Sequence, residues 1–245
     1  MVRRLAGRLI SRPLGIRGVK MELLPVALWA VLFGALVMLA MTVRRILKLA
    51  KKRDALAEES AHKEAEPDIP VPFGYKCAWY AVRTENPLSV ATHLGLRGVR
   101  TANWREGVQK AYETSVFVSP PVRGWILAAG RCLFPNSPFP QAITPSVEAL
   151  SLAHGEAMFF ATDRITETHF WAKATKGVLE RGFGYSGESG EVLWDRGPKT
   201  EEENAITIDS LDEHTVMDLA RRWCISPSDL PFPDSTPALG LVGKR

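Results

Sequence analysis

The sequence has 245 residues, 46% of them hydrophobic and 24% charged, and a formal net charge of +4. The positive charge lies in its first part, because residues 1–22 carry +5 and residues 44–53 carry +6, whereas residues 54–68 carry −5 and residues 69–245 carry −2. Nucleic-acid binding requires a cationic excess on the folded domain itself, so composition argues against a nucleic-acid partner.

Residues 23–43 form a stretch of 21 residues without a charge. At about 1.5 Å per helical residue it covers roughly 31 Å, close to the thickness of a bilayer's hydrocarbon core. We therefore expect a transmembrane helix here. A cleaved signal peptide and a buried core helix are poorer alternatives, since the run is longer than a signal sequence and has no polar face.

A block of cations follows the apolar stretch at once. Such a block stops translocation and attracts anionic lipid, so we expect the bilayer to be one partner of the chain. Its members are Arg44, Arg45, Lys48, Lys51, Lys52 and Arg53.

The start of the chain decides its predicted orientation. With Met1 as the start, six basic residues flank the apolar stretch on each side and the positive-inside rule gives no answer. A start at Met21 leaves the basic block on one side only, which favours a cytoplasmic carboxy-terminal domain. If Met21 is the start, residues 1–20 are an overextended start. If Met1 is the start, residues 1–22 are a basic amino-terminal arm.

The rest of the chain divides into three predicted parts. Residues 44–72 are a tether, basic and then acidic, that ends in a proline-rich segment. Residues 73–232 form one globular domain, and residues 233–245 are expected to be a flexible tail. The three cysteines, Cys77, Cys132 and Cys224, are too sparse for a disulfide framework and indicate free thiols in a reducing compartment.

The first half of the domain contains both strands and helices. Residues 75–82 predict a central strand that is apolar on both faces, and Asn86 and Asn103 are predicted caps of two helices. Residues 115–119 and 124–129 predict a hairpin. A loop with four prolines follows, and Thr144-Pro145 is expected to open the next helix.

The second half is rich in strand patterns. We expect an antiparallel meander, then a capping box at Thr200 and Glu203, and a last helix that opens at Ser210 with Glu213. These elements predict an α+β domain with an antiparallel sheet and several short helices. The predicted meander strands are residues 156–163, 168–175, 178–187 and 191–195.

Five short runs carry a resemblance to a family. They are YKCAWYAV, VFVSPPVRGW, HFWAKA, GESGEVLWDRG and TEEE, between Tyr75 and Pro227. In these runs the chain resembles a widespread group of uncharacterised bacterial proteins that has no established activity. The resemblance implies a shared compact α+β domain and brings no catalytic residues with it. With the apolar stretch, it places the chain in the bacterial inner membrane, with a single span.

An aromatic and basic set of side chains is the candidate binding surface. Alternation along two neighbouring strands places the set on one face, which we expect to be a solvent-facing platform unless a helix packs over it. The same alternation places Leu179 with them. The six members are His169, Trp171, Lys173, Arg181, Phe183 and Tyr185.

Signals for catalysis are weak. A nucleophile pair of Cys77 with His93 or His169 competes with the simpler interpretation that Cys77 is a core thiol. The carboxylates of Asp195 and residues 201–203 suggest a metal or proton site less than the first turn of a helix. We therefore predict no catalytic residue, cofactor or metal.

The resulting hypothesis is a membrane-anchored domain that binds a protein or a ligand without catalysis. Two alternatives stay open: a membrane-tethered hydrolase, and an immunity or antitoxin-like protein that binds a toxin. A concave pocket with converging His, Cys or carboxylate groups favours the enzyme, and an aromatic patch favours binding.

Overall fold

The computed structural model describes residues 23–62, 65–135 and 139–245. Within the first helix it describes side chains at residues 29, 31–49 and 51, and the side chains of residues 139, 140 and 209 are likewise outside the description. The predicted arm at residues 1–22 lies outside the described residues. The chain divides into two compact units, residues 1–63 and residues 64–245.

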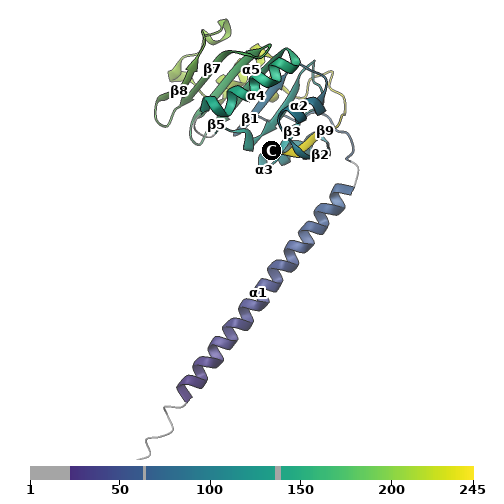
Figure 1. Cartoon of the computed structure of the whole chain (residues 1–245), viewed down its shortest axis with the longest axis vertical. Coiled ribbons are helices and arrows are strands. Elements are labelled where there is room, and N and C mark those ends of the chain that lie inside the picture. Colours follow the sequence, from purple (N-terminus) through teal and green to yellow (C-terminus); the bar gives the residue numbers. More distant parts are fainter. Residues whose placement is uncertain (1–22, 63–64, 136–138) are drawn as a thin grey trace, which may run out of the picture. The chain divides into compact units, whose positions relative to one another are not determined.

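The first unit contains a single described helix, α1 (Leu23–His62). It continues without a break from the apolar stretch through the basic block into the acidic part of the predicted tether (Figure 1). Its described side chains are exposed. Among the described residues, no helix combines the length and the apolar character that a membrane crossing requires. The transmembrane helix expected at residues 23–43 is therefore not confirmed.

The second unit is built on one antiparallel sheet of nine strands in the order β2-β9-β3-β4-β1-β5-β6-β7-β8. This confirms the predicted α+β class. The strands are β1 (Cys77–Val82), β2 (Arg97–Ala102), β3 (Val116–Val118), β4 (Ile126–Gly130), β5 (Glu156–Asp163), β6 (Thr168–Thr175), β7 (Val178–Ser186), β8 (Glu191–Arg196) and β9 (Gly240–Lys244).

Helices cover both faces of the sheet. Helices α2 (Pro87–His93) and α4 (Phe139–His154) pack on one face, and α3 (Trp104–Glu113) and α5 (Glu213–Trp223) pack on the other. Short 3-10 turns lie in the segments between strands and helices: η1 (Arg131–Leu133), η2 (Glu201–Glu203), η3 (Ile208–Ser210) and η4 (Pro227–Asp229).

The central strand β1 contributes to both hydrophobic cores. All six of its residues are buried, as its two-sided apolar sequence predicts. Trp79 lies in the core under α3 and α5, whereas Tyr80 lies in the core under α2 and α4. The period of two along a strand thus divides one apolar run between two cores.

Local signals place several helix starts correctly. The Asn86 side chain accepts a hydrogen bond from the Ser89 amide (3.0 Å), and Gly95 after α2 has φ +68°. The Asn103 side chain accepts from the Glu106 amide (3.0 Å). The predicted caps are confirmed because each side chain satisfies an amide that the first helical turn leaves free.

Two predicted helix starts are wrong. Helix α4 begins at Phe139, so the four-proline loop is shorter than expected and Pro145 lies inside the helix. The buried stripe of Ile143, Val147 and Leu150 on the sheet compensates for the hydrogen bond that proline cannot donate. Helix α5 is capped by Asp212, and not by Ser210, because the Asp212 carboxylate accepts from the Thr215 amide (2.8 Å).

The predicted flexible tail at residues 233–245 contains a strand of the sheet. Strand β9 lies between β2 and β3, and its Val242 is 5% exposed. Two glycines in a five-residue strand weaken the alternation by which a strand is identified. Strand β2 was missed for a related reason, since its RGVRTA sequence is polar and it lies at the edge of the sheet.

The meander of β5 to β8 is confirmed, with one correction to its faces. The register between β6 and β7 shifts after Lys173, so that Lys173 pairs with Arg181 and Ala174 pairs with Leu179. Glu180 is the extra residue of this bulge. A bulge reverses the alternation, so Leu179 belongs to the core under α4 and not to the face of Arg181.

Candidate functional site

Strands β6 and β7 bring the six predicted site residues together in three cross-strand pairs. His169 lies opposite Tyr185, Trp171 opposite Phe183, and Lys173 opposite Arg181. The rings of Trp171 and Phe183 stack with centroids 4.6 Å apart. Alternation therefore identified a contiguous set.

The expected solvent-facing platform is wrong, because this face of the sheet is covered. Trp171 and Arg181 are each 1% exposed, and His169 is 2% exposed. Helix α5 packs here, with the Lys173 ammonium 5.8 Å from the Trp223 ring centroid. The alternative expectation, that a helix packs over this face, is the correct one. A binding site on this face must therefore be a cavity beneath the segments that cover it.

The Arg181 guanidinium is the central group of this face. Its Nε donates to both carboxylate oxygens of Glu203, at 2.9 and 3.0 Å. Burial of a guanidinium is tolerated only when acceptors replace the lost water. The Nη1 acceptors are the carbonyl oxygens of Gly182, Arg196 and Gly197, at 3.1 to 3.2 Å, and the carboxylate of Asp195.

Glu203 is equally buried, at 1% exposed, and joins three segments. Besides Arg181, it accepts hydrogen bonds from the Trp171 indole Nε1 (2.8 Å) and from the Thr200 amide (3.0 Å). The capping box predicted from Thr200 and Glu203 is thereby confirmed. The sequence did not predict that the same carboxylate is the buried partner of Arg181. The available signal was an arginine within the apolar alternation of β7.

A cavity of about 220 Å³ lies beside this ion pair. Trp171 and Phe183 form apolar walls, and Val192 (45% exposed) and Ile208 (43% exposed) lie at its rim. We call it the Arg181 cavity. Its lining residues are Trp171, Arg181, Phe183, Val192, Asp195, Lys199, Glu203, Ile206, Ile208 and Leu211.

The Arg181 cavity is electrostatically balanced, and an unpaired donor lies buried beside it. Arg181 and Lys199 offset Asp195 and Glu203, so the lining has no formal net charge. The buried Nη2 of Arg181 has no hydrogen-bond partner among the described residues. Because this nitrogen is itself buried, a ligand acceptor reaches it only when the lining side chains shift. A neutral acceptor, such as a carbonyl oxygen, would then satisfy the donor without adding charge.

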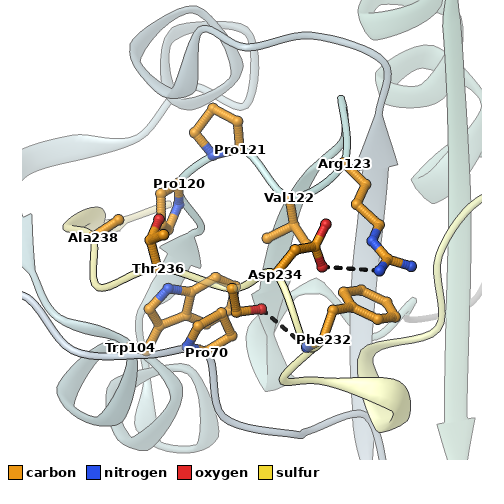
Figure 2. Close-up of a pocket in the computed structure, with 11 residues that line it drawn as sticks. Pro70, Trp104, Pro120, Pro121, Val122, Arg123, Phe232, Asp234, Thr236 and Ala238 are labelled. Atoms are coloured by element: carbon orange, nitrogen blue, oxygen red, sulfur yellow. Dashed lines mark hydrogen bonds and ion pairs between the residues drawn. The ribbon is translucent and has the colours of Figure 1, made fainter.

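A second, smaller cavity of about 100 Å³ lies between Trp104 and the segments at residues 120–123 and 232–238 (Figure 2). At its rim Arg123 pairs with Asp234 (2.9 Å), and its guanidinium stacks 3.8 Å from the Phe232 ring centroid. Its lining includes three prolines and two aromatic rings beside polar side chains, and its volume suits only a few atoms. It is the weaker candidate.

The groups considered for catalysis do not converge. The Cys77 thiol donates to the Ala78 carbonyl (3.4 Å), and burial raises its pKa to about 12, which suits a core thiol. Within the described ranges, no three His, Cys, Asp or Glu side chains are grouped as a metal would require. Of the predicted carboxylates, Glu203 is committed to Arg181, and the Asp195 side chain is 56% exposed on the same guanidinium.

Comparisons with protein-family models, with curated proteins and with solved structures find no match. The resemblance to uncharacterised bacterial proteins therefore stays a prediction, and the case for a function depends on the geometry of the domain.

The two carboxylates on Arg181 give a matched test of the buried pair. Glu203→Ala should destabilise the domain by about 3–5 kcal/mol, because it leaves a buried guanidinium without its counter-ion. Asp195→Ala should cost about 1 kcal/mol or less, since that carboxylate is largely solvated. Chemical unfolding of each variant measures both values. Equal losses for the two variants would show that burial of Glu203 has no special role.

His169 gives a prediction of pH dependence. Its Nδ1 lies 2.9 Å from the Thr162 hydroxyl, and burial lowers its pKa from 6.5 to about 4. Between these pH values the unfolded chain binds a proton that the folded domain does not, so stability falls as the pH falls through this window, by up to about 3 kcal/mol. His169→Gln should remove this part of the pH dependence. An unchanged slope between pH 6.5 and pH 4 in unfolding titrations would contradict the prediction.

Proposed function

We propose that the chain is a membrane-anchored binding module whose Arg181 cavity receives an apolar group bearing a neutral hydrogen-bond acceptor. The observation that carries this proposal is a buried arginine with one unpaired donor beside an apolar cavity. An unsatisfied buried donor costs free energy that a ligand acceptor recovers on binding. The apolar walls supply the rest of the affinity by burial of surface.

The exposed rim indicates how a ligand enters. Val192 and Ile208 are exposed although they are apolar, and each lies at the edge of the cavity. Contact with a ligand would remove both side chains from water. The volume of about 220 Å³ suits one ring or one branched side chain, so the ligand is a small molecule of that size or a side chain of a partner protein.

Anchoring by residues 23–43 is the second part of the proposal. Its support is the uncharged stretch of 21 residues followed by six cations within ten residues. The proposed location is the bacterial inner membrane, with the domain on the cytoplasmic side, where the three cysteines would stay reduced. A membrane-tethered hydrolase is not favoured. Hydroxyl groups do lie beside histidines, at Ser89 with His154 (3.2 Å) and at Thr162 with His169 (2.9 Å). Neither pair lines the Arg181 cavity, and among the described residues no carboxylate is hydrogen-bonded to either imidazole to orient it as a base.

The anchor and its orientation are tested together in cells. The full chain should stay with the membrane pellet after carbonate extraction, whereas a chain that begins at Glu64 should be released. The exposed Cys132 is the reporter of orientation, since Cys77 is buried. A membrane-impermeant maleimide should label Cys132 only after lysis, with Cys132→Ser as the blank. Carbonate release of the full chain, or labelling of intact cells, would contradict this part of the proposal.

The cavity is tested with two probes of similar size. N-acetylphenylalaninamide carries a ring and neutral carbonyl groups, whereas phenylacetate carries a ring and a charge. The neutral probe should bind more tightly, because the lining is already charge-balanced. Val192→Asp at the rim should weaken binding about tenfold or more by placing a charge beside the apolar probe. Ile165→Asp is the matched control, since Ile165 is 71% exposed and does not line the cavity.

Calorimetric titration of the full chain in detergent measures these affinities. Equal binding to the wild type and to Val192→Asp, or a preference for phenylacetate, would overturn the assignment of the cavity.

A further inference from the structure

A row of cations lies at one end of the sheet, on the half that contains the edge strand β2. Arg97 begins β2, Lys244 ends β9, Arg131 follows β4, and Lys76 precedes β1. Arg245 follows Lys244. We call these five residues the basic end. Four are exposed and Lys76 is half-buried.

The strand register shows that these cations are neighbours. Arg97 lies directly opposite Lys244. Gly243 pairs with Val116, and Gly130 lies close to the same part of β3, since a Cβ on Gly130 would be 3.3 Å from the Val116 side chain. The next residues, Lys244 and Arg131, therefore extend from the same end of the sheet, roughly two strand spacings or 10 Å apart.

The basic end has no counter-ions of its own. Across the described residues, none of the ion pairs includes any of its five members. Glu113, which ends α3 just before β3, is paired with Lys110 (2.9 Å). Like charges directly opposite each other, as at Arg97 and Lys244, destabilise a sheet. An external anion would remove that repulsion.

The other half of the same end has the opposite sign. Asp163, Glu167 and Glu188 lie at the ends of β5 to β8, where the register brings Asp163 opposite Thr168 and Thr168 opposite Ser186, and these carboxylates outnumber the exposed Arg164 of the same turn. The charge of −2 over residues 69–245 therefore conceals a separation of charge along the sheet. A polarised surface orients a domain against a charged partner.

We propose that the basic end contacts the anionic headgroups of the membrane that anchors the chain. This inference rests on the proposed anchor at residues 23–43. Cations arranged along neighbouring strands match a surface of repeated phosphates, and clustered Lys and Arg are attracted to anionic leaflets over about a Debye length. The acidic half is repelled by the same surface, so the β2 edge faces the membrane.

This orientation leaves the Arg181 cavity accessible. Strands β2 and β8 are opposite edges of the sheet, and the cavity is lined by residues of β6, β7 and β8. With the β2 edge against lipid, the cavity faces away from the bilayer. Asp68 lies 25 residues beyond Val43, so the tether by itself does not hold the domain at the surface. The basic end supplies that contact.

The test measures how close the basic end lies to lipid in the full chain. The chain is labelled with a fluorophore at Cys132, which is exposed and adjacent to Arg131. It is reconstituted into vesicles of phosphatidylcholine alone or with about 30% phosphatidylglycerol, both with a nitroxide on a fraction of the headgroups. Quenching should be at least about twofold greater in the anionic vesicles, and should fall as salt is raised.

The charge-reversal variant Arg97→Glu/Lys244→Glu should reduce quenching in anionic vesicles to the level of the neutral vesicles. The variant Arg97→Gln/Lys244→Gln removes the same charges with less perturbation and should act in the same direction. The matched control is Arg105→Glu/Lys176→Glu, which reverses two exposed cations outside the basic end and should leave quenching unchanged.

Any of three results would overturn the proposal. The first is equal quenching in neutral and anionic vesicles, and the second is wild-type quenching in both basic-end variants. The third is a loss of quenching in the control variant as large as that in the basic-end variants. Salt-sensitive binding of polyglutamate without a lipid effect would also overturn it, and would identify an acidic macromolecule as the partner. Flotation with neutral vesicles after a high-salt wash tests the anchor separately. A chain that fails flotation but is quenched by anionic vesicles would show that only the anchor is wrong.

Discussion

Burial of the Arg181 guanidinium is the constraint on which this side of the domain depends. A buried cation needs acceptors in fixed positions, and here they come from β7, from the end of β8 and from the turn at Glu203. The Gly197 carbonyl can approach because Gly197 has φ +77° and no side chain, since a Cβ there would lie 2.0 Å from the Glu180 carbonyl oxygen. One side chain thus fixes the segments that form the cavity.

The arrangement separates two surfaces at opposite edges of one sheet. Nine strands at about 4.8 Å spacing place β2 roughly 38 Å from β8. The basic end lies toward β2, and the Arg181 cavity lies toward β8. A domain held at a membrane by one edge can therefore present the other to a ligand, which is the relation that the proposed function requires.

Much of the fold followed from local patterns. The two-sided apolar run of β1, the alternation and glycine turns of β5 to β8, and the asparagine caps at Asn86 and Asn103 each have a local physical cause. The elements that the sequence did not predict depend on tertiary contacts. Strand β9 has little alternation of its own and is stabilised by the neighbours β2 and β3, and Pro145 is carried inside α4 by packing on the sheet.

The sequence predicted correctly which residues lie together at the candidate site, but it did not predict that they are buried. Alternation brought Trp171, Arg181 and Phe183 to one face, yet whether a helix covers a face depends on a segment some 30 residues later in the chain. The partnership of Arg181 with Glu203 was hidden because the capping box already explained Glu203. A side chain that completes a helix cap can at the same time be the buried partner of a residue far away in the sequence.

The most direct measurement is the NMR spectrum of the Arg181 side chain during titration with N-acetylphenylalaninamide. The unpaired Nη2 protons should shift as the ligand carbonyl accepts from them, while the Nε proton, which is held by Glu203, should move little. That result would place the acceptor in the Arg181 cavity. Unchanged Nη2 resonances at a ligand concentration that saturates binding would show that the ligand binds elsewhere and would contradict the account.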